Sequence, residues 1–399
     1  MKLPCPPPMT PSRKRRPAKG NSAMLSSSTF WPPGTGLQKP SSELILTKFN
    51  TRNFFCNPSI TSGGGTMTRI ALLGCGRIGK MHAATIARAE GATLAAVYDP
   101  LTAAAEEIGR LYGCPVAASA DEAIALADAV LIATSTATHA DLIEASARAG
   151  KAIFCEKPID LSLARLVACR KAIAGFDRPV QIGFNRRHDP GHRAARDAVH
   201  AGKIGDLQQV IITSRDPGLA SRDYLKVSGG IFRDMTIHDF DLARFMLGEE
   251  PVEVFATGST LIDPTLTEFD DVDSTMIILR TASGKLCHIN NSRAAAYGYD
   301  QRVELFGAKG MLISGNRRAH QVERFTATAT GAGEPYLDFF IERYVEAFEI
   351  GLKSFLHCVA ANAAPDVTFD DGEKALVLAE AAIRSKAEGR FIRVEEITG

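Results

Sequence analysis

The stretch RIALLGCGRIG at residues 69–79 joins an apolar strand pattern to the glycine pattern GxGxxG, with glycines at Gly74, Gly76 and Gly79. In this pattern the first glycine permits a tight turn and the second lets a phosphate approach the backbone. The third glycine lets the following helix pack against the strand. Because the motif follows a predicted strand and opens a predicted helix at 77–90, it predicts a dinucleotide-binding turn.

The acidic residue expected after a dinucleotide-binding turn is present as Asp99. Asp99 ends the second predicted strand, 25 positions after Gly74. A carboxylate there accepts hydrogen bonds from ribose hydroxyls and repels a 2′-phosphate, which favours NAD over NADP. The free amides at the helix N-terminus then face the phosphates. We therefore expect NAD to be bound by Gly74, Gly76, Arg77, Ile78, Gly79 and Asp99. The alternative is a glycine-rich turn without a cofactor.

Strands and helices alternate after Met67. Predicted strands lie at 69–73, 93–98, 129–133, 152–155 and 179–183, and predicted helices at 77–90, 101–112, 138–149 and 161–174. Apolar strands that alternate with helices indicate a parallel sheet covered on both faces. We predict an α/β protein whose N-terminal domain, residues 67–188, is a doubly wound Rossmann sheet.

The pattern changes after Pro190. Helices are predicted at 191–201, 234–247, 338–360 and 372–388, and strands at 207–214, 252–259, 274–281, 285–293, 302–307, 311–314 and 321–326. Consecutive strands joined by short turns indicate an antiparallel sheet. We predict a C-terminal α+β domain, residues 189–399, with a large, mostly antiparallel sheet for substrate binding and oligomerisation.

Residues 1–66 differ in composition from the rest. They are rich in Pro, Ser, Thr and Gly, carry the basic run RKRR at 13–16, and contain one acidic residue, Glu43. No hydrophobic period is sustained there, so we expect a disordered N-terminal extension. Three explanations compete, in this order: an over-extended gene model, an organelle transit peptide, and a nucleic-acid-binding arm.

The overall composition narrows the function classes. Lys and Arg total 46 against 45 Asp and Glu, so no global positive field favours nucleic acid or an anionic membrane. No apolar run approaches the roughly 20 residues of a membrane span. The eight scattered cysteines include no CxxC pair, which favours free thiols in a reducing compartment. We expect a cytoplasmic enzyme without nucleic-acid or membrane partners, with organelle import as the alternative.

Three residues have the chemistry of alcohol oxidation. Lys157 lies in Glu156-Lys157-Pro158 at the end of an apolar strand, where doubly wound folds bind ligands. Asp234 and His238 are four residues apart on a predicted helix, hence on one face. His238 can take a proton near neutral pH, and Asp234 can orient its ring. The alternatives are a helix-capping aspartate with an unrelated histidine, or a metal site. We predict no metal, because a further ligand is lacking.

Other polar residues also follow predicted strands. Arg186 or Asn185 could reach substrate hydroxyls, although solvated charge in a loop explains them nearly as well. Thr134 and His139 could line the nicotinamide or pyrophosphate. We therefore assign Thr134, His139, Glu156 and Lys157 to the cofactor, and Lys157, Arg186, Asp234 and His238 to the substrate.

Four motifs together resemble the GFO/IDH/MocA oxidoreductases: RIG at 77–79 with His82, CEKP at 155–158, GFNRR at 183–187, and GG at 229–230 followed by DMTIHDFD at 234–241. The resemblance spans Met67 to the C-terminus. It implies NAD-dependent oxidation of a secondary alcohol of a cyclic polyol, myo-inositol to 2-keto-myo-inositol (scyllo-inosose). It further implies that Lys157, Asp234 and His238 are catalytic, with His238 as base, and that the protein is a homo-oligomer, a tetramer or dimer. The alternatives are a dehydrogenase for another inositol isomer, sugar or sugar acid, and a non-catalytic NAD-binding regulator.

Overall fold

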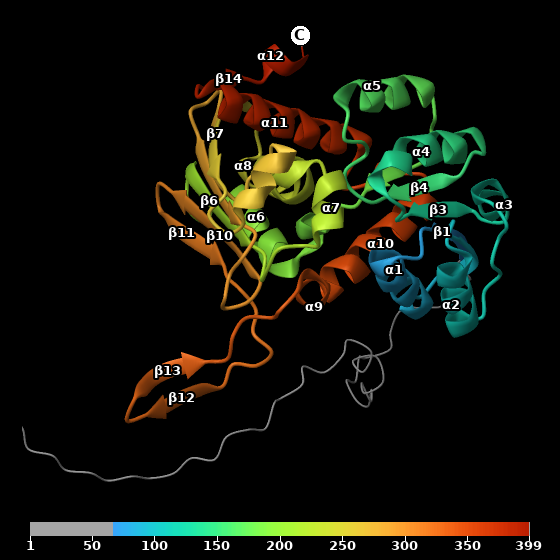
Figure 1. The fold of residues 1–399 in the computed structure, drawn as a ribbon, viewed down its shortest axis with the longest axis horizontal. Coiled ribbons are helices and arrows are strands. Elements are labelled where there is room, and N and C mark those ends of the chain that lie inside the picture. The colour runs from blue at the N-terminus through green and yellow to red at the C-terminus, as the bar shows by residue number, and fades with distance from the viewer. Residues whose placement is uncertain (1–66, 399) are drawn as a thin grey trace, which may run out of the picture. The chain divides into compact units, whose positions relative to one another are not determined.

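The structure, a computed structural model, describes residues 67–398 (Figure 1). The disorder expected for residues 1–66 lies outside the described residues. The described residues belong to one compact unit. Within them, no helix combines the length and apolar composition that a membrane span requires.

The first sheet has five parallel strands in the order β2-β1-β3-β4-β5. The strands are β1 (Thr68–Leu73), β2 (Ala92–Tyr98), β3 (Ala129–Ile132), β4 (Ala152–Cys155) and β5 (Val180–Ile182). The helices that alternate with them are α1 (Arg77–Arg88), α2 (Thr102–Tyr112), α3 (Ala120–Ala125), α4 (His139–Arg148) and α5 (Leu163–Ala172). The strand order reverses between β1 and β3, which is where doubly wound folds bind dinucleotides. The predicted Rossmann sheet is confirmed.

The core of this sheet includes a helix from far along the chain. Strand β1 is buried on both faces, as its unbroken apolar run predicts. Leu352 and Phe355 of α10 (Val345–Ala361) pack in the cluster that contains Ile70 and Leu72. The Phe355 ring meets the edge of Phe154 in β4, with ring centroids 5.7 Å apart. The division into residues 67–188 and 189–399 therefore stays a prediction, since α10 completes the first core.

The second sheet has seven strands in the order β11-β10-β6-β9-β8-β7-β14. Only the β6–β9 pair is parallel, so the predicted, mostly antiparallel sheet is confirmed. The strands are β6 (Leu207–Arg215), β7 (Pro251–Ser259), β8 (Ser274–Thr281), β9 (Leu286–Ser292), β10 (Asp300–Gly307), β11 (Gly310–Ser314) and β14 (Ile392–Arg393).

Helices cover one face of this sheet. Figure 1 shows α6 (Pro190–His200), α8 (Ile237–Leu247) and α11 (Phe369–Glu388) on the same side. Burial alternates along β8, with Ile277 and Leu279 enclosed and Met276 60% exposed. The exposed positions form an open face, which the described helices leave uncovered.

Several elements differ from the sequence expectation. The helix expected at 234–247 begins with a π-helical turn, Phe232–Thr236, and continues as α8. The helix expected at 338–360 is two helices, α9 (Phe340–Arg343) and α10. Strand β12 (Glu323–Thr326) pairs with β13 (Ala329–Gly333) as a separate ribbon and does not join the large sheet. The short elements α3, α7 (Arg222–Val227), β13, β14 and α12 (Glu395–Thr398) were not expected, because they are too short for a hydrophobic period.

Candidate active site

Lys157 and Asp234 meet although 77 positions separate them. Lys157 follows β4, and its Nζ donates a hydrogen bond of 2.7 Å to the backbone carbonyl of Asp234. The same ammonium lies 3.7 Å from Asp234 Oδ1, and both side chains are largely buried. An ammonium has three donors, so two remain for other acceptors. The structure thus brings together two of the three predicted catalytic residues in direct contact.

His238 in α8 is kept neutral. Burial lowers its pKa well below the ordinary value, and the charges of Lys157 and Arg186 lower it further. Its Nδ1 is enclosed without a hydrogen-bond partner among the described residues, and its ring meets the edge of Phe184 at 5.9 Å. Because Nδ1 is enclosed, a proton from a ligand would reach the ring at Nε2. A neutral imidazole at neutral pH is the form that a general base needs.

The carboxylate of Asp234 is held by partners other than His238. Its Oδ1 accepts a hydrogen bond of 2.7 Å from the Tyr224 hydroxyl, and its Oδ2 lies 3.2 Å from Arg293 Nη1. Within the described chain, the structure records no hydrogen bond between Asp234 and His238. Asp234 lies in the π-helical turn Phe232–Thr236, and His238 lies in α8 just after it.

The glycine turn has the geometry of a dinucleotide site. Gly74 has φ +96°, and a Cβ there would lie 2.4 Å from the Ala133 carbonyl oxygen. A Cβ on Gly79 would lie 1.9 Å from the Gly74 carbonyl oxygen, so both positions require glycine. A Cβ on Gly76, by contrast, would have no atom of the described residues within 4 Å beyond its own residue and chain neighbours. These three environments match the tight turn, the helix packing and the phosphate approach predicted for them.

The start of α1 is open to an anion. Its N-cap residue, Gly76, makes no side-chain capping bond, and the first turn has no acidic side chain. The amides of Arg77 and Ile78 belong to the first turn, whose N–H groups have no partner within the helix. The Arg77 guanidinium stacks on Phe339, 5.1 Å from the ring centroid. The Arg77 side chain therefore packs against an aromatic ring. The backbone of this turn therefore fits a pyrophosphate.

Asp99 braces the same turn. Its Oδ2 accepts a hydrogen bond of 2.7 Å from the amide of Cys75, and its Oδ1 accepts one of 2.8 Å from the amide of Leu101. Each carboxylate oxygen has a further lone pair, so the group can still accept from a ribose hydroxyl. The structure adds a supporting role to the one predicted from the sequence.

His139 joins the loops that follow β3 and β4. Its Nδ1 lies 2.7 Å from the Pro158 carbonyl oxygen, and its Nε2 lies 3.1 Å from the Thr134 carbonyl oxygen. Burial lowers its pKa, and the ring is 1% exposed. The predicted direct contact of His139 with a cofactor finds no support here, because both ring nitrogens face backbone carbonyls. Its position instead sets where Thr134 and the turn at Pro158 lie.

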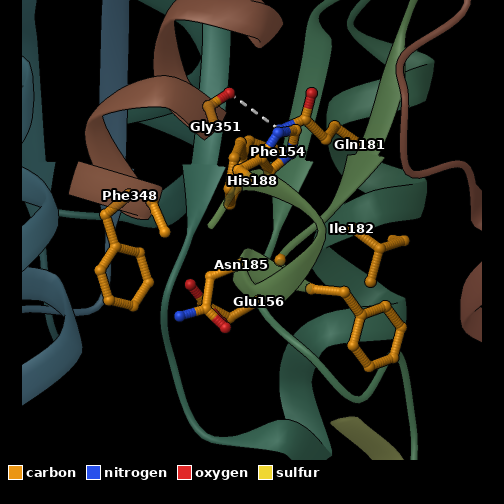
Figure 2. A pocket seen from close by; sticks show the side chains of 11 residues that line it. Phe154, Glu156, Gln181, Ile182, Asn185, His188, Phe348 and Gly351 are labelled. Atoms are coloured by element: carbon orange, nitrogen blue, oxygen red, sulfur yellow. Dashed lines mark hydrogen bonds between the residues drawn. The ribbon is translucent and has the colours of Figure 1, made fainter. Parts of the chain in front are cut away.

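The carboxylate of Glu156 also faces inward. Its Oε1 lies 2.6 Å from Nε2 of the buried His82 in α1. It lines a small, partly open cavity of about 10 Å³, to which Gln181 and His188 also contribute; Figure 2 shows Glu156 next to Asn185. A Cβ on Gly183 would lie 2.7 Å from Glu156 Oε2, so the glycine makes room for this carboxylate. The side chain of Glu156 thus bonds to α1, and the contact of Glu156 with the cofactor stays a prediction.

Arg186 is likewise committed inside the protein. It forms a buried ion pair with Asp239, and its Nη2 donates to Ser214 Oγ at 3.1 Å. The next residue, Arg187, binds Asp241 at 2.5 and 2.8 Å. The predicted contact of Arg186 with substrate finds no support in this geometry. These two pairs instead fasten α8, and with it His238, to the segment after β5.

Sequence reasoning missed Tyr224 and Arg293, whose side chains form hydrogen bonds to the Asp234 carboxylate. Arg293 follows β9 and is 2% exposed; its Nη2 lies 3.5 Å from Asp271 Oδ2. Tyr224 lies in the unexpected helix α7. No local sequence motif identifies either residue, because each contacts the Asp234 carboxylate only in the folded protein.

The chain matches two family models and is similar to several known proteins. Residues 68–184 match the family model described as "Oxidoreductase family, NAD-binding Rossmann fold", and residues 192–313 match the one described as "GFO/IDH/MocA C-terminal domain". The chain is 52% identical over 328 residues to "Inositol 2-dehydrogenase" of Rhizobium meliloti, covering 82% of this chain and 99% of the relative. It is 42% identical over 337 residues to "Myo-inositol 2-dehydrogenase" of Thermotoga maritima, covering 83% and 100%. The crystal structure of scyllo-inositol dehydrogenase from Lactobacillus casei, with bound NAD(H) and scyllo-inositol, superposes with a TM-score of 0.77 at 29% identity, covering 83% and 100%.

Proposed function

Because this chain belongs to the GFO/IDH/MocA family of NAD-dependent oxidoreductases, we propose that it oxidises myo-inositol at one secondary alcohol, giving 2-keto-myo-inositol (scyllo-inosose). Support for the substrate comes from the relatives at 52% and 42% identity, whose names specify inositol 2-dehydrogenases. Support from the structure is the contact of Lys157 Nζ with the Asp234 carbonyl at 2.7 Å, beside the neutral His238.

The residues have distinct tasks in this oxidation. NAD, when bound, supplies the acceptor for the hydride that leaves the alcohol carbon. His238 takes the hydroxyl proton at Nε2, since its lowered pKa keeps the ring unprotonated. Lys157 offers its free N–H groups to the same oxygen and stabilises the negative charge that develops there. Asp234 holds Lys157 near and can accept from a neighbouring hydroxyl of the ring.

A panel of substrates tests the proposal. NADH formation would be followed by absorbance with myo-inositol, scyllo-inositol, other inositol isomers, aldoses and sugar acids, using NAD in excess. We expect the highest kcat/KM with myo-inositol. If another compound gives a higher kcat/KM, that compound is the substrate, and the type of reaction stays as proposed. NAD binding without turnover of any polyol would overturn the reaction and leave the regulatory alternative.

We further propose that the protein is a homo-oligomer, a tetramer or dimer, assembled through the open face of the seven-stranded sheet. Exposed apolar side chains support this, among them Met276 and Ile313, each 60% exposed, and Phe306, 43% exposed. A cytoplasmic location stays a prediction.

A further inference from the structure

Helix α7 places a tyrosine on the candidate catalytic carboxylate. The Tyr224 hydroxyl donates a hydrogen bond of 2.7 Å to Asp234 Oδ1. Burial and the charge of Asp234 raise the pKa of Tyr224, so the phenol keeps its proton across the neutral range. It acts on Asp234 as a donor.

Among the described residues that contact the Asp234 carboxylate, Tyr224 is the one that hydrogen-bonds Oδ1. Arg293 lies 3.2 Å from Oδ2, and Lys157 lies 3.7 Å from Oδ1. Arg293 alone would allow the carboxylate to pivot about Oδ2. The phenol fixes the second oxygen, on the side that faces Lys157. The orientation of the carboxylate toward the ammonium therefore depends on Tyr224.

The position of Tyr224 is set from outside the site. Arg222, two residues earlier, donates 2.5 Å hydrogen bonds to Thr265 Oγ1 and to Glu268 Oε2. Its guanidinium also stacks on Phe269, 4.9 Å from the ring centroid. The far end of the segment passes through Gly229 and Gly230, both at positive φ. Helix α7 is thus anchored to the segment before β8 and brings its phenol to the site as a fixed element.

We propose that Tyr224 is a positioning residue for the oxidation. It holds Asp234 Oδ1 so that the carboxylate keeps Lys157 aligned with the reacting oxygen. The inference rests on the proposed function for its chemistry. Tyr224 exchanges no proton in the reaction, and its effect passes through Asp234.

A double-mutant cycle tests this directly, with Tyr224→Phe, Asp234→Asn and the double variant. Removing one hydrogen bond to a charged group predicts about a 10-fold loss of kcat/KM for the polyol in Tyr224→Phe, mainly in kcat. We expect an unchanged Kd for NAD and an unchanged Tm. In the Asp234→Asn background the same substitution should change kcat less than about 2-fold, since the partner charge is already gone.

Two matched controls separate positioning from folding. Tyr112→Phe removes the hydroxyl of a partly buried tyrosine in α2, and Asp223→Ala alters α7 at a side chain that is 95% exposed. Both should keep wild-type kcat. A wild-type kcat in Tyr224→Phe, or an equal loss in both backgrounds, would overturn the inference. The substrate panel on the wild type decides the proposed function separately, and the cycle uses whichever polyol that panel selects.

Discussion

At the scale of single residues, the imidazole of His238 determines the pH dependence of the site. Its pKa lies well below 6.5 because the ring is buried and because Lys157 and Arg186 are positively charged. A base with a lowered pKa is already unprotonated at neutral pH. We therefore expect kcat to stay level through neutral pH and to fall only at acidic pH, below the usual imidazole range, as measured from pH 4.5 to 9.

Removal of this base is the matching test. His238→Ala should lower kcat by about 10²–10⁴-fold, the usual contribution of general base catalysis, and leave the Kd for NAD nearly unchanged. A His238→Ala enzyme with near-normal kcat and the wild-type pH profile would remove His238 from the mechanism.

Cofactor choice also depends on one side chain. Asp99→Ser should raise the ratio of kcat/KM with NADP to kcat/KM with NAD, because the charge that repels a 2′-phosphate is lost. The serine hydroxyl can still accept from the Cys75 amide, whereas Asp99→Ala loses the bonds to Cys75 and Leu101 together. We expect the alanine variant to bind NAD more weakly than the serine variant. Equal or better efficiency of the wild type with NADP would contradict the assignment.

The candidate catalytic set was predictable, but the partners of its members were not. Lys157, Asp234 and His238 each stand in a local motif at a strand end or helix start. Arg293, by contrast, reaches Asp234 across 59 positions, and no local pattern records such a contact. Arg186 shows the converse limit: the sequence leaves open a solvated charge in a loop, whereas the fold buries Arg186 in an ion pair with Asp239.

At the scale of elements, alanine substitutions at two glycines of the turn should have different effects, one on folding and the other on NAD binding. Gly79→Ala should prevent stable folding, because its Cβ would lie 1.9 Å from a backbone oxygen. Gly76→Ala meets open space and should change Tm little, yet its Cβ would lie on the path predicted for the pyrophosphate and should raise the Kd for NAD at least about 10-fold. Thermal unfolding and calorimetric titration measure the two effects. Unchanged NAD affinity in Gly76→Ala would place the phosphates elsewhere.

Long elements were predictable from their hydrophobic period, and the π-helical turn was not. The apolar spacing after Asp234 is that of an α-helix. Tertiary contacts hold the turn instead: Asp271 Oδ1 accepts from the Ile231 amide at 2.8 Å, and Thr236 Oγ1 donates to Asn291 at 2.7 Å. The same limit applies to α7, whose six residues are fewer than two helical turns.

At the scale of the whole molecule, the open face of the second sheet should be an interface between copies of this chain. Met276→Glu combined with Ile313→Glu places two charges on that face, and we expect light scattering after size exclusion to show a smaller assembly. Leu111→Glu is the control, since Leu111 is 65% exposed on α2, in the other half of the fold. A monomeric wild type, or a double variant with the wild-type mass, would contradict this assignment.

Helix α10 has a consequence for how the chain is made. Leu352 and Phe355 complete the core around β1, yet they leave the ribosome about 280 residues after that strand. Until then, the newly emerged parallel sheet has an unfilled apolar surface beside Phe154. Such transiently exposed surface is what chaperones bind. The nascent N-terminal half should therefore depend on a chaperone until synthesis reaches α10, and slower translation of the second half should lengthen that dependence.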